Sequence, residues 1–139
     1  MSSDPTQRSK RILVADDDPL IRHLVTSIVK KEGYSVVVAK DGREAYRLLQ
    51  GDADFMAAIF DMMMPNLGGL DLIRRMRSEK LLMSIPVLVI TSELDWKVMT
   101  DSFAAGATVF LPKPFTPAQL RNTLQMLLSH ALINSLPAS

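Results

Sequence analysis

Three carboxylates, two hydroxyls and one ammonium group each follow a short apolar stretch of the chain, where a strand would end. They are Asp16, Asp17, Asp61, Thr91, Ser92 and Lys113. Acids brought together in a partly buried site repel one another strongly, and a divalent hard cation removes that repulsion. Ligands that are all oxygen favour Mg²⁺ or Mn²⁺ over zinc. Such a set suits phosphoryl transfer, which requires mainly positioning and charge neutralisation.

The segment 57–69, AAIFDMMMPNLGG, contains the acid that we predict to react. An apolar run, 56–60, leads to Asp61 and is followed by the breakers Pro65 and Gly68-Gly69, a pattern typical of a buried strand running into a loop. An acid at the end of such a strand is open to solvent yet held by the core. We predict that Asp61 accepts a phosphoryl group, with Lys113 pairing first with Asp61 and then with a phosphoryl oxygen.

Five apolar stretches alternate with five stretches of helical periodicity. The strands are predicted at 12–15, 35–39, 56–60, 87–90 and 108–111, and the helices at about 19–32, 42–51, 67–79, 94–105 and 117–130. This alternation predicts an α/β fold, because parallel strands need crossovers and the crossover helices cover both faces of the sheet. The candidate is a doubly wound five-stranded parallel sheet of order 2-1-3-4-5, one of the common orders.

Three helix starts have recognisable capping residues. Asp18 precedes Pro19, which is an N-cap acceptor followed by proline at the first helical position. Asp41 with Glu44, and Thr116 with Gln119, have the spacing of a capping box.

The predicted sheet brings the reactive side chains together. In open parallel sheets, ligands bind beyond the carboxyl ends of the strands, near the point where strand order reverses. Because the first and third strands are neighbours in the candidate order, Asp16, Asp17 and Asp61 should meet there. Thr91, Ser92 and Lys113 should lie on the same edge of the sheet.

The composition limits the class of protein. A chain of 139 residues with 47% hydrophobic and 22% charged residues is typical of one soluble globular domain. The net charge of +1 gives no reason to expect binding to nucleic acid or to a membrane, and no apolar run is long enough to span one. The absence of cysteine fits a reducing cytoplasm. We expect a flexible N-terminal segment at 1–10, one domain at 11–130 and a C-terminal tail at 131–139.

The segments ILVADDDP, IFDMMMPNLGG, VLVITS and FLPKPFT resemble the motifs of the response-regulator receiver domain of two-component phosphorelay signalling. The resemblance covers about residues 11–128, with the motifs in the family's order and spacing, and it points to a single-domain, chemotaxis-regulator-like member. It implies a flavodoxin-like fold and a phosphoprotein that uses Mg²⁺.

The resemblance assigns the metal site and the phosphoacceptor. Asp61 would be the phosphoacceptor. Asp17, Asp61 and the backbone carbonyl of Met63 would ligate Mg²⁺, and Asp16 would act mainly through water.

The resemblance also assigns the switch. Thr91 would be the switch hydroxyl, Lys113 the lysine of the family and Phe110 the switching aromatic residue. The Lys113–Pro114 peptide bond is expected to be cis, as in the family.

The sequence departs from the family's usual motif at one position, and it has its own residues at the positions that influence the phosphoryl site. Gly68 stands where many members carry Asp, which should alter only the loop before the third helix. Met63, Ser92 and Glu93 are the predicted modulating residues beside the phosphoryl site. Either Met63 shields the site, or Glu93 orients water or pairs with Lys113, and the sequence leaves both alternatives open.

Several methionine and aromatic residues could serve either packing or function. Methionine often fills gaps in a core, and we predict this for Met62 and Met64. Trp96 and Phe103, together with Phe110, are expected to form part of an exposed face that changes on phosphorylation. Packing against the core explains Phe103 equally well.

The expected function is signalling rather than catalysis on a separate substrate. A sensor histidine kinase or a histidine phosphotransfer protein would offer a phosphohistidine, and the chain would catalyse its own phosphorylation and dephosphorylation. The output would pass to a downstream protein target, with a possible homodimer through the fourth helix, fifth strand and fifth helix. The alternatives are a degenerate receiver that is not phosphorylated and a magnesium-dependent phosphohydrolase. Met63 disfavours the hydrolase, because such enzymes commonly carry an acid there.

Overall fold

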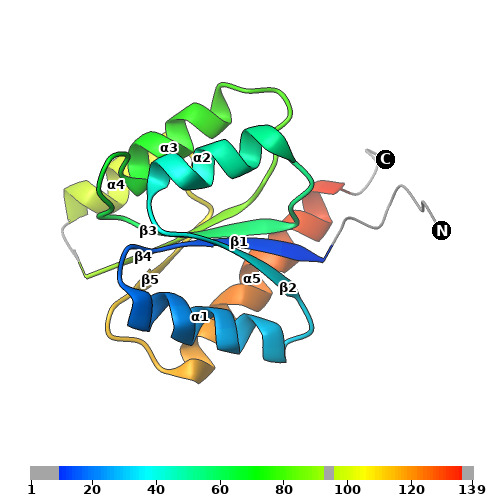
Figure 1. Ribbon diagram of the computed structural model, residues 1–139, viewed down its shortest axis with the longest axis vertical. Helices are drawn as coiled ribbons and strands as arrows, with labels where there is room; N and C mark the ends of the chain where they lie inside the picture. Colours follow the sequence, from blue (N-terminus) through cyan, green and yellow to red (C-terminus); the bar gives the residue numbers. More distant parts are fainter. Residues whose placement is uncertain (1–9, 93–95, 136–139) are drawn as a thin grey trace.

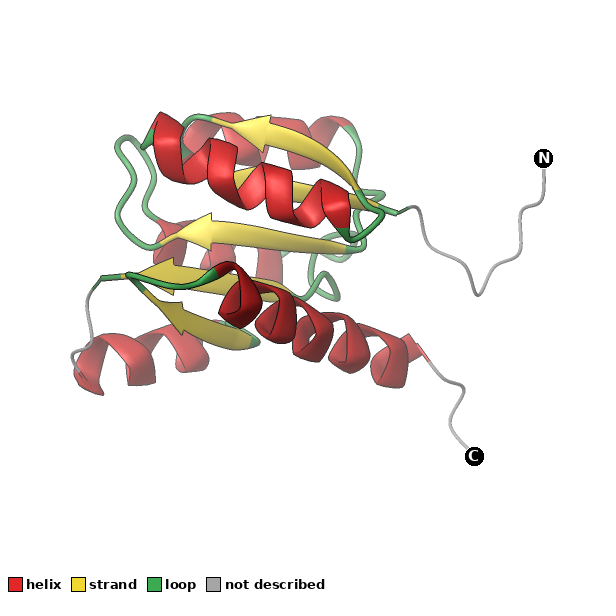
Figure 2. Cartoon of the chain, turned by 90° about the horizontal axis from the view of Figure 1, so that it is seen from below, coloured by secondary structure: helices red, strands yellow, loops and turns green. Residues whose placement is uncertain are grey.

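A parallel five-stranded sheet forms the centre of the molecule (Figures 1 and 2). The computed structural model describes residues 10–92 and 96–135. The strands are β1 (Arg11–Ala15), β2 (Ser35–Ala39), β3 (Ala57–Asp61), β4 (Val87–Thr91) and β5 (Val109–Pro112). Their order is β2-β1-β3-β4-β5, as predicted, and all four pairings are parallel.

Five helices cover the two faces of the sheet. They are α1 (Pro19–Lys31), α2 (Gly42–Gly51), α3 (Gly69–Arg77), α4 (Trp96–Ala105) and α5 (Pro117–Ser135). In Figure 1, α1 and α5 lie below the sheet, whereas α2, α3 and α4 lie above it. The predicted doubly wound α/β fold is therefore confirmed. No helix of the described residues is long and apolar enough to cross a membrane.

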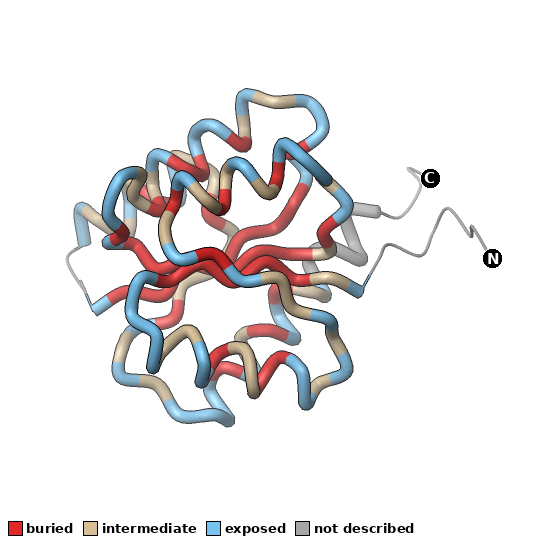
Figure 3. The backbone as a smooth tube through the Cα atoms, in the orientation of Figure 1, coloured by how far each residue is buried: buried red, intermediate tan, exposed pale blue. Residues whose placement is uncertain are grey.

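Two hydrophobic cores form because side chains alternate along each strand. In β1, Leu13 and Ala15 belong to the core beneath α2 and α3, whereas Ile12 and Val14 belong to the core shared with α1 and α5. All residues of β3 and β4 are buried, as in a sheet covered on both faces (Figure 3). The strands are consequently held rigidly up to their carboxyl ends.

The predicted helix caps are present. The side chain of Asp18 accepts a hydrogen bond from the Leu20 N–H at 2.9 Å. The side chain of Asp41 likewise accepts one from the Glu44 N–H at 2.8 Å. Thr116 and Gln119 form a reciprocal pair, with distances of 2.9 and 3.1 Å between side-chain oxygen and backbone nitrogen. These caps fix where three of the helices begin.

Two helices differ in length from the prediction. α3 begins at Gly69 rather than near residue 67, because the Leu67 N–H is used in a tight turn to the Pro65 carbonyl (2.8 Å). α5 continues to Ser135 rather than ending near residue 130, because the sequence has no glycine or proline to stop it before residue 137. Of the predicted N-terminal segment, residues 1–9 lie outside the described residues.

Gly68 is the N-cap residue of α3 and provides no side-chain cap. Its φ of −69° is accessible to any residue, and an added Cβ would meet only the Met62 carbonyl oxygen at 3.5 Å, an ordinary contact. An aspartate side chain would therefore fit here. The expectation that its absence alters only the loop before α3 stays a prediction.

Candidate functional site

The register of the sheet places the predicted reactive residues along one edge. Ala15 pairs with Phe60, so Asp16 and Asp61 each come one residue further on adjacent strands. Asp61 pairs with Ile90, the residue before Thr91. Thr91 pairs with Pro112, the residue before Lys113. Figure 2 shows all the strand arrows pointing to this same edge.

The three acids form a compact cluster. Carboxylate oxygens of Asp16, Asp17 and Asp61 all lie within 4.8 Å of one another. Asp16 and Asp61 are buried, whereas Asp17 is exposed, so the cluster opens to solvent on the side of Asp17. One oxygen of Asp16 accepts the Asp18 N–H at 2.9 Å, which holds this carboxylate in the turn after β1.

Lys113 provides the positive charge of the cluster. Its Nζ lies 3.1 Å from Asp61 Oδ1 and 3.8 Å from Asp16 Oδ2. Its backbone N–H donates to the Thr91 carbonyl at 2.8 Å, which ties the end of β5 to the end of β4. The Lys113–Pro114 bond is cis, as expected. The pairing of Lys113 with Asp61 that was predicted from the sequence is present in the structure.

Burial shifts the titration of two acids. Burial is the main reason why the pKa of the Asp16 carboxyl rises to about 6, and the nearby Asp61 charge adds to it against the opposing effect of the Asp18 N–H. Burial also raises the pKa of Asp61, while the hydrogen bond and charge of Lys113 lower it. A cation at the open side of the cluster would therefore replace protons as the compensating charge.

Replacing Asp16 by Asn should change how stability depends on pH in the metal-free protein. A raised pKa means that protonated Asp16 stabilises the fold fully below the unfolded value of 3.8, and that this stability is lost as pH rises through about 6. The variant should therefore be more stable than the wild type at pH 8, by on the order of 2 kcal/mol, with the difference shrinking towards pH 4. Urea unfolding with EDTA between pH 4 and pH 8 measures this. Parallel curves for the two proteins would contradict it.

The predicted switch residues lie on β4 and β5, the two strands that follow β3 in the sheet. Thr91 is fully buried at the end of β4. Phe110 of β5 is half-buried and packs against Phe103 of α4, with ring centroids 5.3 Å apart. Trp96 and Phe103 are exposed by 79% and 48%, so α4 presents aromatic surface to solvent.

The predicted modulating residues have different environments. Met63 is exposed, whereas its neighbours Met62 and Met64 are buried in the core, as predicted. Ser92 is exposed after β4. Glu93 lies outside the described residues, so its pairing with Lys113 stays a prediction.

Sequence reasoning missed two contacts that hold the loops of the site. The Arg22 guanidinium of α1 donates to the Asp16 backbone carbonyl at 2.8 Å. The Asn66 side chain donates to Asp41 Oδ2 at 2.9 Å across two different loops. The sequence offered one local indication of the second contact. Asparagine tolerates positive φ in tight turns, so an asparagine at position 66 suggested a turn there.

The residues present fit a magnesium ion. The donors are carboxylate oxygens without His or Cys, one side of the cluster is open for water, and the acids need a compensating charge. Carboxylate oxygens of Asp16, Asp17 and Asp61 lie close enough together for one ion to bind to them.

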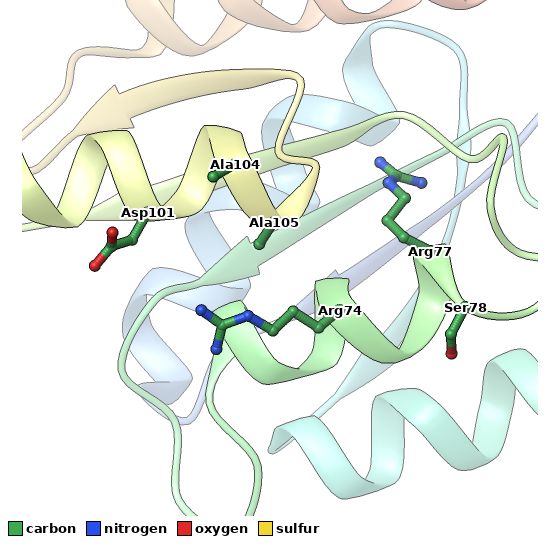
Figure 4. A pocket seen from close by; sticks show the side chains of 6 residues that line it. All are labelled: Arg74, Arg77, Ser78, Asp101, Ala104 and Ala105. Carbon is green, nitrogen blue, oxygen red and sulfur yellow. The ribbon is translucent and has the colours of Figure 1, made fainter.

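A groove of about 480 Å³ between α3 and α4 is separate from this cluster. It is lined by Arg74, Arg77, Ser78, Asp101, Ala104 and Ala105 (Figure 4). The Arg77 guanidinium points away from Arg74 and is engaged by backbone carbonyls, so it is not free to bind a ligand. None of the acids of the cluster contributes to this groove.

Comparisons with known proteins agree with the fold. The sequence matches the family model of the response regulator receiver domain over residues 12–125. The chemotaxis protein CheY1 of Helicobacter pylori is 34% identical over 119 residues, covering 85% of this chain and 96% of that protein. The chemotaxis response regulator CheY4 of Vibrio cholerae has a TM-score of 0.81 at 34% identity, covering 88% of this chain and 100% of that one.

A third relative is the receiver domain of the sensor histidine kinase PA1611 from Pseudomonas aeruginosa. Its TM-score is 0.78 at 25% identity, with 87% of this chain and 98% of that one covered, and its structure is described with a magnesium ion coordinated in the active site cleft. Because the family match spans most of the chain and CheY proteins share its fold, the protein belongs to the response regulator receiver domain family as a CheY-like member.

Proposed function

We propose that this receiver accepts a phosphoryl group on Asp61 in the presence of Mg²⁺ and thereby changes a protein-binding surface. The observation that carries the proposal is the contact of 3.1 Å between Lys113 Nζ and Asp61 Oδ1, with carboxylate oxygens of Asp16, Asp17 and Asp61 within 4.8 Å of one another. The Asp61 carboxylate thus lies next to the positive charge of Lys113. It also lies next to carboxylate oxygens that suit a bound cation.

Mg²⁺, held by Asp17, Asp61 and the Met63 carbonyl with Asp16 acting through water, would neutralise charge on the phosphoryl group. The donor is a phosphohistidine of a sensor histidine kinase or a histidine phosphotransfer protein. An Asp61 oxygen forms a bond to phosphorus as the phosphorus–nitrogen bond to histidine breaks, and the imidazole nitrogen keeps the electron pair and takes up a proton. Lys113 moves from the Asp61 carboxylate to a phosphoryl oxygen.

The switch follows from the neighbouring residues. The Thr91 hydroxyl donates to another phosphoryl oxygen, and Phe110 moves into the space that this shift leaves. Phe110 contacts Phe103, so the movement is passed to the exposed aromatic surface of α4. The surface of α4, β5 and α5 then binds a downstream protein or a second copy of the chain, in the cytoplasm.

Hydrolysis of the acyl phosphate returns the protein to its resting state. Water attacks phosphorus, and the carboxylate of Asp61 leaves. Met63, two residues after Asp61, is exposed. Either Met63 limits the approach of water, or Glu93 orients the water or pairs with Lys113. The chain thus promotes its own phosphorylation and dephosphorylation without acting on a separate substrate.

The test uses the full chain with a small phosphoryl donor such as phosphoramidate. We expect intact-mass spectrometry to show one phosphoryl group with Mg²⁺ and none with EDTA. Beryllofluoride should bind only with Mg²⁺, which would exclude a receiver that is not phosphorylated. Multiple turnover of a simple phosphate ester, in place of stoichiometric labelling, would favour the hydrolase and overturn the proposal.

A further inference from the structure

The loop between β3 and α3, residues 62–68, is attached at its tip to the start of α2. The Asn66 side-chain amide donates to Asp41 Oδ2 at 2.9 Å. Asn66 has a φ of +72°, a conformation that asparagine tolerates better than most residues. Met63, whose carbonyl is the proposed metal ligand, lies three residues before this contact.

Asp41 is itself fixed in place. Its other carboxylate oxygen, Oδ1, caps α2 by accepting the Glu44 N–H at 2.8 Å. The Glu44 N–H and then the Asn66 amide lower the pKa of the Asp41 carboxyl, so it is ionised at neutral pH. The loop is thus anchored to a residue whose orientation α2 determines.

Backbone packing supports the same attachment. A Cβ on Gly42, the first residue of α2, would lie 1.8 Å from the Leu67 carbonyl oxygen, so only glycine allows this approach. At the base of the loop, the Gly69 N–H donates to the Met62 carbonyl at 3.0 Å. The buried side chains of Met62 and Met64 hold the segment on either side of Met63.

We propose that Asp41 and Asn66 are positioning residues for the magnesium site, because their hydrogen bond holds the β3–α3 loop, which carries the Met63 carbonyl. This inference rests on the proposed function. A loop that is ordered before the metal arrives loses less conformational freedom on binding. Neither residue touches the ion; each acts through the loop.

Replacing Asn66 by Gly removes the amide and still permits positive φ. We expect Mg²⁺ affinity to fall about fivefold, the equivalent of one ordinary hydrogen bond, in isothermal titration of the full chain. In the metal-free protein, hydrogen exchange of the Leu67 and Gly69 amides should become faster. The matched control is Asp52→Asn, an exposed hydrogen-bonded acid at the opposite end of α2, which should change neither quantity.

An exchange of side chains tests the contact itself. Asn66→Asp places two carboxylates against each other and should speed exchange of the Leu67 and Gly69 amides. Adding Asp41→Asn restores a donor and an acceptor, retains the α2 cap and returns the net charge to that of the wild type. The double variant should recover slow exchange and a Mg²⁺ affinity within about twofold of the wild type.

The outcomes separate this inference from the proposed function. If the wild-type chain does not bind Mg²⁺, both fail. If the wild type binds Mg²⁺ and is phosphorylated while Asn66→Gly leaves the affinity and amide exchange unchanged, only the positioning role is overturned. Failure of the double variant to recover either quantity also overturns it.

Discussion

Replacing Asp61 by Asn is expected to abolish phosphorylation of the chain, with a loss in rate of at least about a thousandfold. The amide lacks the anionic oxygen that attacks phosphorus, and the substitution removes the negative charge that lies 3.1 Å from Lys113 Nζ. The loss should not come from unfolding. Burial raises the pKa of Asp61, so the fold disfavours its charge, and a neutral side chain of the same shape should be at least as stable without metal.

The measurement is intact-mass analysis after exposure to phosphoramidate and Mg²⁺, with the site identified by peptide mapping. Asp18→Asn is the matched control, because Asp18 neighbours the acidic cluster yet only caps α1, and Asn caps a helix equally well. This control should be phosphorylated at the wild-type rate. Equal labelling of Asp61→Asn and the wild type would falsify the assignment of the phosphoacceptor.

Most of the fold could be predicted because its information is local. Apolar runs of four or five residues, each followed by helical periodicity, gave all five strands within one residue at each end. Asp18, Asp41 and Thr116 marked helix starts through hydrogen bonds that span only two or three residues. Helix ends were less accurate, since a helix that lacks glycine or proline stops where packing ends, as at the end of α5.

The acidic cluster could be predicted for a different reason. Asp61 and Thr91 end a strand and Asp16 and Lys113 follow one, and a parallel sheet brings all its carboxyl ends to one edge. Strand order and residue type were therefore sufficient, without any knowledge of side-chain conformation.

The contacts that support the site could not be predicted in this way. Arg22 donates to a backbone carbonyl, which every residue has, so nothing in the sequence marks the acceptor. Asn66 and Asp41 are 25 residues apart and meet only because Gly42 lets the loop approach α2. Such contacts depend on distances between packed elements, which residue spacing does not give.

Charged side chains lie at both ends of the strands, and the structure accommodates them differently. The carboxyl edge holds two acids whose charged forms are disfavoured by burial, as the raised pKa values of Asp16 and Asp61 indicate. Arg77 lies at the C-terminal end of α3, on the side of the sheet away from the acids. Among the described residues, its side chain donates the largest number of hydrogen bonds.

Replacing Arg77 by Met should therefore lower the free energy of unfolding by about 3 kcal/mol, the largest stability effect that we expect from a partly exposed side chain. The guanidinium donates to the carbonyls of Gly106, Met83 and Ile85 at distances from 2.7 to 3.2 Å. Its loss leaves these acceptors without their charged donor. Burial lowers the pKa of Arg77, and no carboxylate of residues 10–92 and 96–135 forms an ion pair with it, so its stabilising effect comes from these three carbonyls.

Arg74→Met is the matched control, since Arg74 lies on the same helix but is exposed and pairs only with Asp71 across one helical turn. It should cost less than about 0.5 kcal/mol in urea unfolding, as exposed ion pairs do. Arg77→Lys should retain the charge but recover only part of the stability, because one ammonium cannot reach three carbonyls in the fork geometry of a guanidinium. Folded Arg77→Met should still be phosphorylated, because the groups that surround Asp61 lie at the other edge of the sheet. Equal losses for Arg74→Met and Arg77→Met would show that charge at the end of α3, rather than the carbonyl contacts, determines the stability.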